Sequence, residues 1–145
     1  MRPALFAVLV VPYAVELDGA VAYAVFRPAT GRDRAWHALS AEGLRGMSPL
    51  DAARWRAWRM AGVPRDAAYL TLDSRASIPE PDAPAGLPEH AFAVRVCADE
   101  VRPPPGQLEH SWVTYEIADR MLHCQADRNA LWELRRRLGH PASCC

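Results

Sequence analysis

The sequence contains no lysine, and all seventeen of its cationic residues are arginine. Seventeen aspartate and glutamate residues balance them, so the formal net charge is zero. A balanced charge provides no basic field for nucleic acid and no acidic tail for a basic partner. A GC-rich genome is the simplest explanation for the missing lysine, because it also accounts for the abundant alanine. The arginine content alone therefore does not indicate a function.

Cysteine is also scarce. The four cysteines are Cys97, Cys124, Cys144 and Cys145. They are too few and too irregularly spaced for a disulfide framework. His123 and His140 lie near three of them, but the group lacks the ligand spacing of a standard zinc site. We therefore expect no metal there.

No apolar run is long enough to span a membrane. Residues 5–11 are rich in β-branched and aromatic side chains, as a buried strand is, and residues 20–26 form a second such run. Asp18-Gly19 between them is a strong hairpin signal. The alternative is a signal peptide, which Pro12, Glu16 and Asp18 disfavour because they interrupt or follow the apolar run. We expect a hairpin, no membrane association and a cytoplasmic protein.

A length of 145 residues is that of a single domain, which we place at residues 1–140, followed by a short tail at 141–145. The clearest helix begins after Ser48, a favourable N-cap, with Pro49 at its first position. Asp51 stands three residues after Ser48, as in a capping box. Gly62 ends the helix and Pro64 prevents its restart.

The other elements follow from apolar runs and capping residues. Gly139 and Pro141 end the last helix, which Asp127 is expected to cap. The expected elements are strands at 36–40, 69–72, 91–96 and 111–113, a proline-rich loop at 77–88, and helices at 115–122 and 128–138. This order predicts an α+β domain or a layered α/β/α domain.

Several ordered segments resemble one protein family. They are residues 46–63, 72–79, 88–94, 109–113 and 127–134. Together they resemble a bacterial Nudix subgroup related to the enzymes that hydrolyse nucleoside and pterin triphosphates. The resemblance covers residues 4–138 and implies the Nudix fold, a mixed β-sheet sandwiched between helices. It also implies a diphosphate hydrolase whose box helix carries glutamates that bind Mg²⁺ or Mn²⁺.

The residues at the metal-binding positions of that box differ from the family pattern. Counting back from Gly62, the leading glycine of the box falls on Ala41 and its arginine on Trp55. The glutamate positions fall on Met47, Arg56, Arg59 and Met60. All expected metal carboxylates are absent, so the box is degenerate. No cofactor is expected, and Mg²⁺ or Mn²⁺ would be needed only if this assignment of the box were wrong.

The first hypothesis is a binding protein for a small phosphorylated molecule, such as a nucleotide or a metabolite. Arg56 and Arg59 lie three residues apart, so they project from one face of the helix, where guanidinium groups can bind phosphate directly. Arg75 and Glu89 match positions near the family's pocket, and Trp36 lies in a strand that leads to it. Each of these residues also has a purely structural interpretation.

The second hypothesis is an active enzyme. A diphosphate hydrolase could take its metal ligands from Glu42, Glu89 and Glu109. A metal-independent enzyme could use Glu109, His37 and His90 for acid and base catalysis.

The third hypothesis is a protein-interaction module. Trp55 and Trp58 lie three residues apart on the same helix and could form a partner or homodimer surface.

Overall fold

Strand β1 (Ala7–Val15) lies at the centre of a six-stranded mixed sheet. The computed structural model describes residues 5–80 and 83–139 of the chain. The remaining elements are β2 (Val21–Pro28), β3 (Leu39–Glu42), α1 (Pro49–Ala61), β4 (Ala68–Glu80), β5 (Ala83–Arg95), η1 (Ala98–Glu100), β6 (Leu108–Val113), α2 (Tyr115–Met121) and α3 (Gln125–Leu138). In the described part of the chain, no helix is both long and apolar enough to cross a membrane.

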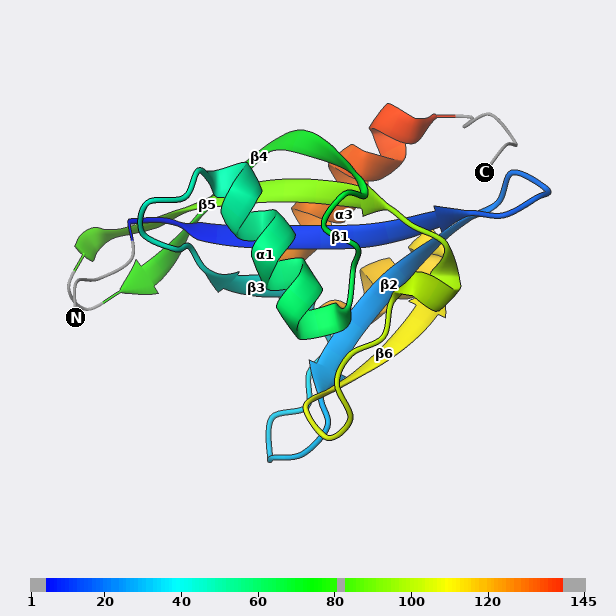
Figure 1. Ribbon diagram of the computed structural model, residues 1–145, viewed down its shortest axis with the longest axis horizontal. Coiled ribbons are helices and arrows are strands. Elements are labelled where there is room, and N and C mark those ends of the chain that lie inside the picture. Colours follow the sequence, from blue (N-terminus) through cyan, green and yellow to red (C-terminus); the bar gives the residue numbers. More distant parts are fainter. Residues whose placement is uncertain (1–4, 81–82, 140–145) are drawn as a thin grey trace.

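The sheet forks along one side of β1. Strands β4, β5, β1, β2 and β6 form a continuous path in that order. β5 pairs with β1 in parallel, with Glu89 opposite Ala7. On the other side, β3 pairs with the first half of β1, and β2 pairs with its last residues. Two strands thus share one edge of β1 and diverge from it, which is visible in Figure 1.

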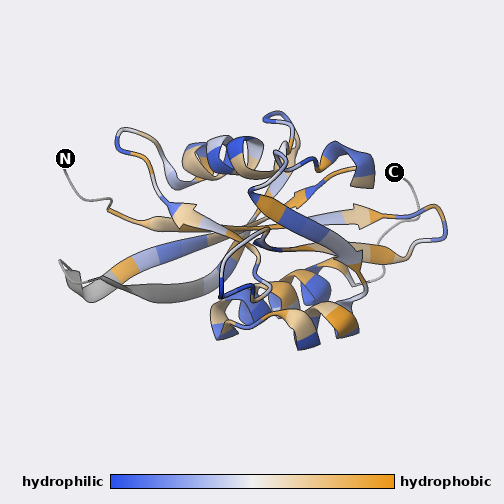
Figure 2. Ribbon diagram, turned by 90° about the horizontal axis from the view of Figure 1, so that it is seen from below, coloured by the Kyte–Doolittle hydropathy of each residue, from blue (hydrophilic) through white to orange (hydrophobic). Residues whose placement is uncertain are grey.

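Helices cover both faces of the sheet, as the edge-on view in Figure 2 shows. On one face, Val8 and Val10 of β1 pack in a cluster with the alanines of α1. On the other face, Leu9 and Val11 pack in a second cluster with Leu131 and Leu134 of α3. Successive residues of a strand point to opposite faces, so the fully buried β1 contributes to both cores. The predicted α/β/α arrangement is confirmed.

Helix α1 begins and ends where the sequence predicts. The Ser48 hydroxyl accepts a hydrogen bond from the Asp51 N–H at 3.1 Å. Gly62 ends the helix in the left-handed conformation with φ of 74°. The hairpin of β1 and β2 and the strands β4, β5 and β6 also overlap the predicted runs.

Three predictions of local structure are wrong. Within the segment expected as a loop at 77–88, residues 77–80 and 83–88 belong to the ends of β4 and β5, with Ser77 opposite Pro88. β1 reaches only as far as Glu89, so this part of the sheet is a two-stranded ribbon beyond β1, where the N–H that a proline lacks is not needed to pair with a third strand. The strand expected at 36–40 is instead two isolated bridges followed by β3.

The third wrong prediction concerns the last helix. Its N-cap is Cys124, and Asp127 lies inside the first turn, where a tertiary contact uses its carboxylate. The predicted tail at 141–145, with Cys144 and Cys145, lies outside the described residues, as does His140.

Candidate functional site

A cavity of about 240 Å³ lies where β2 and β3 diverge. Its walls are mainly apolar, and three polar side chains, Arg27, His37 and Ser40, also line it. The apolar residues that line it include Phe26, Leu39, Met60 and Leu108. They come from β2, β3, α1 and β6, so the fork of the sheet and the helix above it together form the cavity.

Helix α1 faces this cavity through Met60, one of the positions where the resemblance expects a metal-binding glutamate. Arg56 lies one turn earlier on the same face of the helix. Its Nε donates to the Glu42 carbonyl at 2.9 Å, and its guanidinium lies 5.6 Å from the ring centre of Trp55. Arg59 lies 5.5 Å from the same ring. Within the described residues, neither arginine forms an ion pair with a carboxylate.

Arginine side chains partly cover the predicted interaction surface of Trp55 and Trp58. Trp58 is 39% exposed, whereas Trp55 is half-buried. The guanidinium of Arg65 lies 4.7 Å from the ring centre of Trp58, and the guanidinium of Arg59 lies 5.9 Å from the same ring centre. The interaction surface formed by Trp55 and Trp58 stays a prediction.

Glu109 lies beside the cavity but is held by two arginines. Its carboxylate accepts hydrogen bonds from Arg27, at 3.2 Å, and from Arg34. The Arg27 guanidinium also lies 4.6 Å from the ring centre of Trp36. The Nε of Arg27 is buried and has no hydrogen-bond partner in the described part of the chain. Glu109 and Trp36 thus position Arg27, a cation whose role the sequence analysis missed.

The side chain of His37, which precedes β3 in the chain, contacts the first turn of α3. Its Nδ1 is 3.4 Å from Oδ2 of Asp127 and 3.5 Å from Sγ of Cys124. The same Asp127 oxygen accepts a hydrogen bond from the Ala38 N–H at 3.2 Å. Burial raises the pKa of the Asp127 carboxyl, although the Ala38 N–H and His37 act in the opposite direction. Burial also raises the pKa of the Cys124 thiol, and the charge of Asp127 raises it further.

A second buried carboxyl lies nearby on β5. Glu89 is 5% exposed and accepts a hydrogen bond from the Ser40 hydroxyl at 3.2 Å. Burial raises the pKa of this carboxyl above its ordinary value, the Ser40 hydrogen bond lowers it, and the charge of Asp127 raises it. Glu89, Asp127 and Cys124 are therefore close enough to influence one another electrostatically.

The predicted catalytic residues His37 and His90 have different neighbours. The ring of His90 contacts Phe6 edge-on, with 5.8 Å between ring centres. Phe6 packs against the α1 core, whereas His37 contacts the start of α3. Arg75 is opposite His90 in the pairing of β4 with β5. The roles assigned to these residues stay predictions.

The sequence analysis also missed Asp127 and Cys124 as partners of His37. A signal was present: Cys124 and Asp127 are three residues apart at the start of a helix, so both can face the same neighbour. What the sequence lacked was any indication that His37 lies against that helix.

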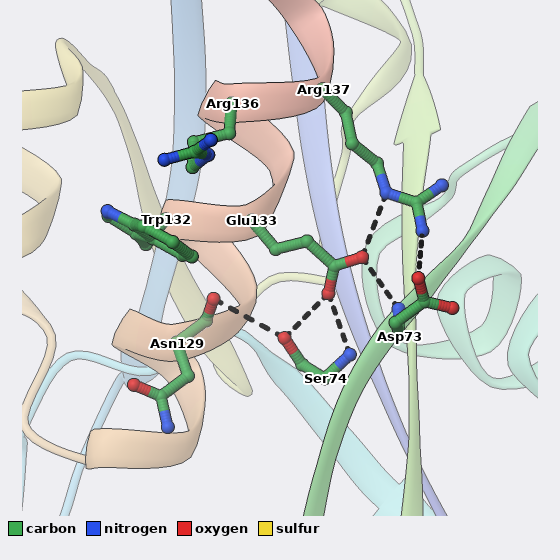
Figure 3. A pocket seen from close by; sticks show the side chains of 7 residues that line it. All are labelled: Asp73, Ser74, Asn129, Trp132, Glu133, Arg136 and Arg137. Carbon is green, nitrogen blue, oxygen red and sulfur yellow. Dashed lines mark hydrogen bonds and ion pairs between the residues drawn. The ribbon is translucent and has the colours of Figure 1, made fainter.

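A larger cavity of about 600 Å³ lies between α3 and β4 and is shown in Figure 3. Its main carboxylate, Glu133, accepts hydrogen bonds from Ser74 and Asp73 and pairs with Arg137. These contacts already use both oxygens of Glu133. Arg136 also lines this cavity, and its guanidinium lies 5.0 Å from the ring centre of Trp132.

The chain resembles solved structures of Nudix proteins, although no family sequence model and no curated protein sequence matches it. A NUDIX hydrolase from Listeria monocytogenes superposes with a TM-score of 0.77 at 24% identity, covering 94% of each chain. The NUDIX domain of Shewanella oneidensis NrtR, complexed with ADP ribose, gives 0.71 at 10% identity, covering 95% of this chain and 90% of that one.

The dihydroneopterin triphosphate pyrophosphohydrolase of E. coli gives a TM-score of 0.65 at 13% identity, covering 87% of this chain and 91% of that one. These similarities span nearly the whole of each chain. The protein therefore has the Nudix fold, as the sequence analysis expected.

Proposed function

We propose that this protein binds a small phosphorylated molecule, such as a nucleotide or a phosphorylated metabolite, in the cavity at the fork. The observation that supports this most directly is Arg27, which lines the cavity and whose buried Nε has no partner within the described residues. A buried N–H without an acceptor is unfavourable, so a ligand oxygen placed there would be stabilised. A phosphate oxygen forms a strong, charge-assisted hydrogen bond with a guanidinium.

The chemistry of α1 supports binding without a box metal. Met60 lines the cavity where a metal-binding carboxylate would be needed, and a thioether does not bind Mg²⁺. Arg56 lies one turn away on the same face, and Arg59 is the next cation along the helix. A phosphate that extends from the cavity along α1 would meet guanidinium donors in place of metal ions. Glu89, Trp36 and Arg75 are proposed to support this site.

The comparisons are compatible with this class of ligand. The names of the similar structures mention ADP ribose, Ap4A and dihydroneopterin triphosphate, and each of these molecules carries phosphate groups.

Calorimetry and thermal shift with nucleotides, dinucleotides and nucleotide sugars, with and without Mg²⁺, would test the proposal. We expect binding without metal that falls at least about tenfold in the double variant Arg56→Glu and Arg59→Glu, a loss of about 1.4 kcal/mol. Arg120→Glu is the matched control, because it makes the same charge change on the exposed surface of α2. Unchanged affinity in the double variant, or binding that requires Mg²⁺, would contradict the proposal.

An enzyme is the second candidate, because the imidazole of His37 lines the cavity and Asp127 contacts its Nδ1. A carboxylate in that position orients an imidazole for acid and base chemistry. Chromatographic assay of diphosphate substrates would detect turnover, which we expect His37→Gln to abolish. Retention of full turnover in that variant would exclude His37 from the reaction.

The cytoplasmic location and the homodimer stay predictions. Light scattering on the wild type and on Trp58→Ala would test the homodimer, since Trp58 is the exposed member of the pair. A monomer in both samples would exclude the dimer.

A further inference from the structure

Three side chains with different donor atoms meet at the start of α3. They are a histidine nitrogen, a cysteine sulfur and a carboxylate oxygen, from His37, Cys124 and Asp127. The three donor atoms all lie within 4.8 Å of one another. None of them belongs to α1, so this group is separate from the box positions of the Nudix fold.

Two of the three separations match those of ligands around a tetrahedral metal ion. Zinc lies about 2.0–2.1 Å from nitrogen or oxygen and about 2.3 Å from sulfur, so tetrahedral ligands lie about 3.5 Å (N to S) and about 3.3 Å (N to O) apart. The observed separations are 3.5 Å from His37 Nδ1 to Cys124 Sγ and 3.4 Å from His37 Nδ1 to Asp127 Oδ2. His37 therefore needs little rearrangement toward either partner, whereas the thiol and the carboxylate, which lie within 4.8 Å of each other, would close to about 3.5 Å around a zinc ion.

Backbone contacts hold the two sides of the group together. The N–H of His123 donates to the Trp36 carbonyl at 3.1 Å, and Trp36 forms a parallel bridge with Leu122. His37 is itself fixed by reciprocal hydrogen bonds with Phe26, of 2.7 and 2.8 Å. These bonds fix the segment before β3 against the segment before α3. The histidine and the helix ligands are therefore positioned independently of any metal.

The side chains are also available as ligands. Cys124 is the N-cap of α3, yet its sulfur makes no capping hydrogen bond. Asp127 is buried and receives its only backbone hydrogen bond, within the described residues, from Ala38. A buried carboxylate without a paired arginine or lysine is stabilised by a cation. The His37 side chain is 35% exposed, which leaves a route of entry.

We propose that His37, Cys124 and Asp127 form a mononuclear zinc site with one open coordination position. The mixture of nitrogen, sulfur and oxygen donors suits Zn²⁺, whereas Mg²⁺ and Ca²⁺ require oxygen ligands. Three protein ligands leave a fourth position for water or for an oxygen of a bound molecule. His37 also lines the cavity at the fork, so the ion would lie beside that cavity. This site does not depend on the phosphorylated ligand proposed above.

Metal analysis of untagged, full-length protein tests this site directly. After equilibration with Zn²⁺ and desalting, we expect about one zinc ion per chain by mass spectrometry. Substitution by Co²⁺ should give the visible bands of a tetrahedral ion and a thiolate-to-cobalt charge-transfer band. We expect Cys124→Ser to remove the charge-transfer band and to weaken zinc binding at least about tenfold, as loss of a ligand should. Serine is a favourable N-cap, so this variant keeps α3.

Cysteine controls separate this site from adventitious binding. Cys97→Ser and the double variant Cys144→Ser and Cys145→Ser should keep both the zinc and the cobalt spectrum. Circular dichroism would verify that each variant is folded. The proposal is overturned if the wild type binds no zinc, if folded Cys124→Ser binds zinc as the wild type does, or if the tail variant alone loses the metal.

Discussion

The carboxylate of Glu133 accepts hydrogen bonds from both the N–H and the hydroxyl of Ser74, each at 2.7 Å. Its other oxygen accepts from the N–H of Asp73 at 2.6 Å and pairs with Arg137 at 2.8 Å. Figure 3 shows how this single side chain joins α3 to β4. Glu133 therefore connects the helix to the edge strand of the sheet.

The first prediction concerns Glu133→Gln, which removes the charge from these hydrogen bonds. Burial raises the pKa of Glu133, but the donors of Asp73 and Ser74 and the charge of Arg137 outweigh it and hold that pKa below its ordinary value. The stabilisation is present above the pKa of the unfolded carboxyl and is lost as the pH falls through the folded value. We expect a loss of about 1–3 kcal/mol near neutral pH.

Urea unfolding across a pH series would measure this effect. The difference between the wild type and Glu133→Gln should shrink on acidification. Glu116→Gln is the control, because that side chain is 65% exposed and its pairing with Arg135 should contribute little. An equal effect of the two substitutions would contradict the assignment.

The second prediction concerns the buried Glu89, whose pKa burial raises. The folded protein binds this proton more tightly than the unfolded chain. Its contribution to stability is therefore complete below the unfolded carboxyl pKa and is lost as the pH rises through the folded value. Glu89→Gln should match the wild type in acid and exceed its free energy of unfolding at neutral pH.

Denaturant titrations at acidic and neutral pH check this prediction. Ser40→Ala should deepen the loss in the wild-type background, since the Ser40 hydroxyl favours the charged carboxylate. A Glu89→Gln variant that is less stable than the wild type at neutral pH would contradict the prediction, because the charged carboxylate would then have a stabilising partner besides Ser40.

The third prediction compares two glycines in the left-handed conformation. Gly62 has φ of 74° and a Cβ there would lie 2.9 Å from the Arg102 carbonyl oxygen, whereas Gly106 has φ of 82° and open space around it. Gly106→Ala should cost about 1–2 kcal/mol from backbone strain alone. Gly62→Ala should cost more, because the Arg102 backbone must move as well. Thermal unfolding of both variants measures the difference. Equal losses of stability would show that the contact with the Arg102 backbone adds no cost.

The fourth prediction concerns the core beneath α3. Leu134 is fully buried against the sheet, whereas Leu17 in the β1–β2 turn is 88% exposed. Leu134→Ala should lower the free energy of unfolding by about 2–5 kcal/mol. Leu17→Ala should change it by less than about 0.5 kcal/mol. Urea unfolding compares them, and a small effect at Leu134 would mean that the site collapses around the smaller side chain.

Local patterns in the sequence were enough for much of the fold. Ser48 and Gly62 define α1 because capping and the left-handed conformation depend on residues next to them in the chain. The β1–β2 hairpin follows from two apolar runs around Asp18-Gly19 for the same reason. The proline-rich segment at 77–88 was mispredicted, because only the limited length of β1 makes a proline-containing ribbon acceptable there.

The sequence by itself also determined which residues stand at fixed spacings before Gly62, so the placement of Arg56, Arg59 and Met60 at the box positions is a prediction that requires only counting. Only the tertiary structure decided which distant side chains meet: His37 with Cys124 and Asp127, and Arg27 with Glu109. The physical reason is the distance along the chain over which each interaction acts. Capping and periodicity act within a few residues, whereas a site between β2, β3 and α3 depends on how the fork in the sheet brings separate segments together.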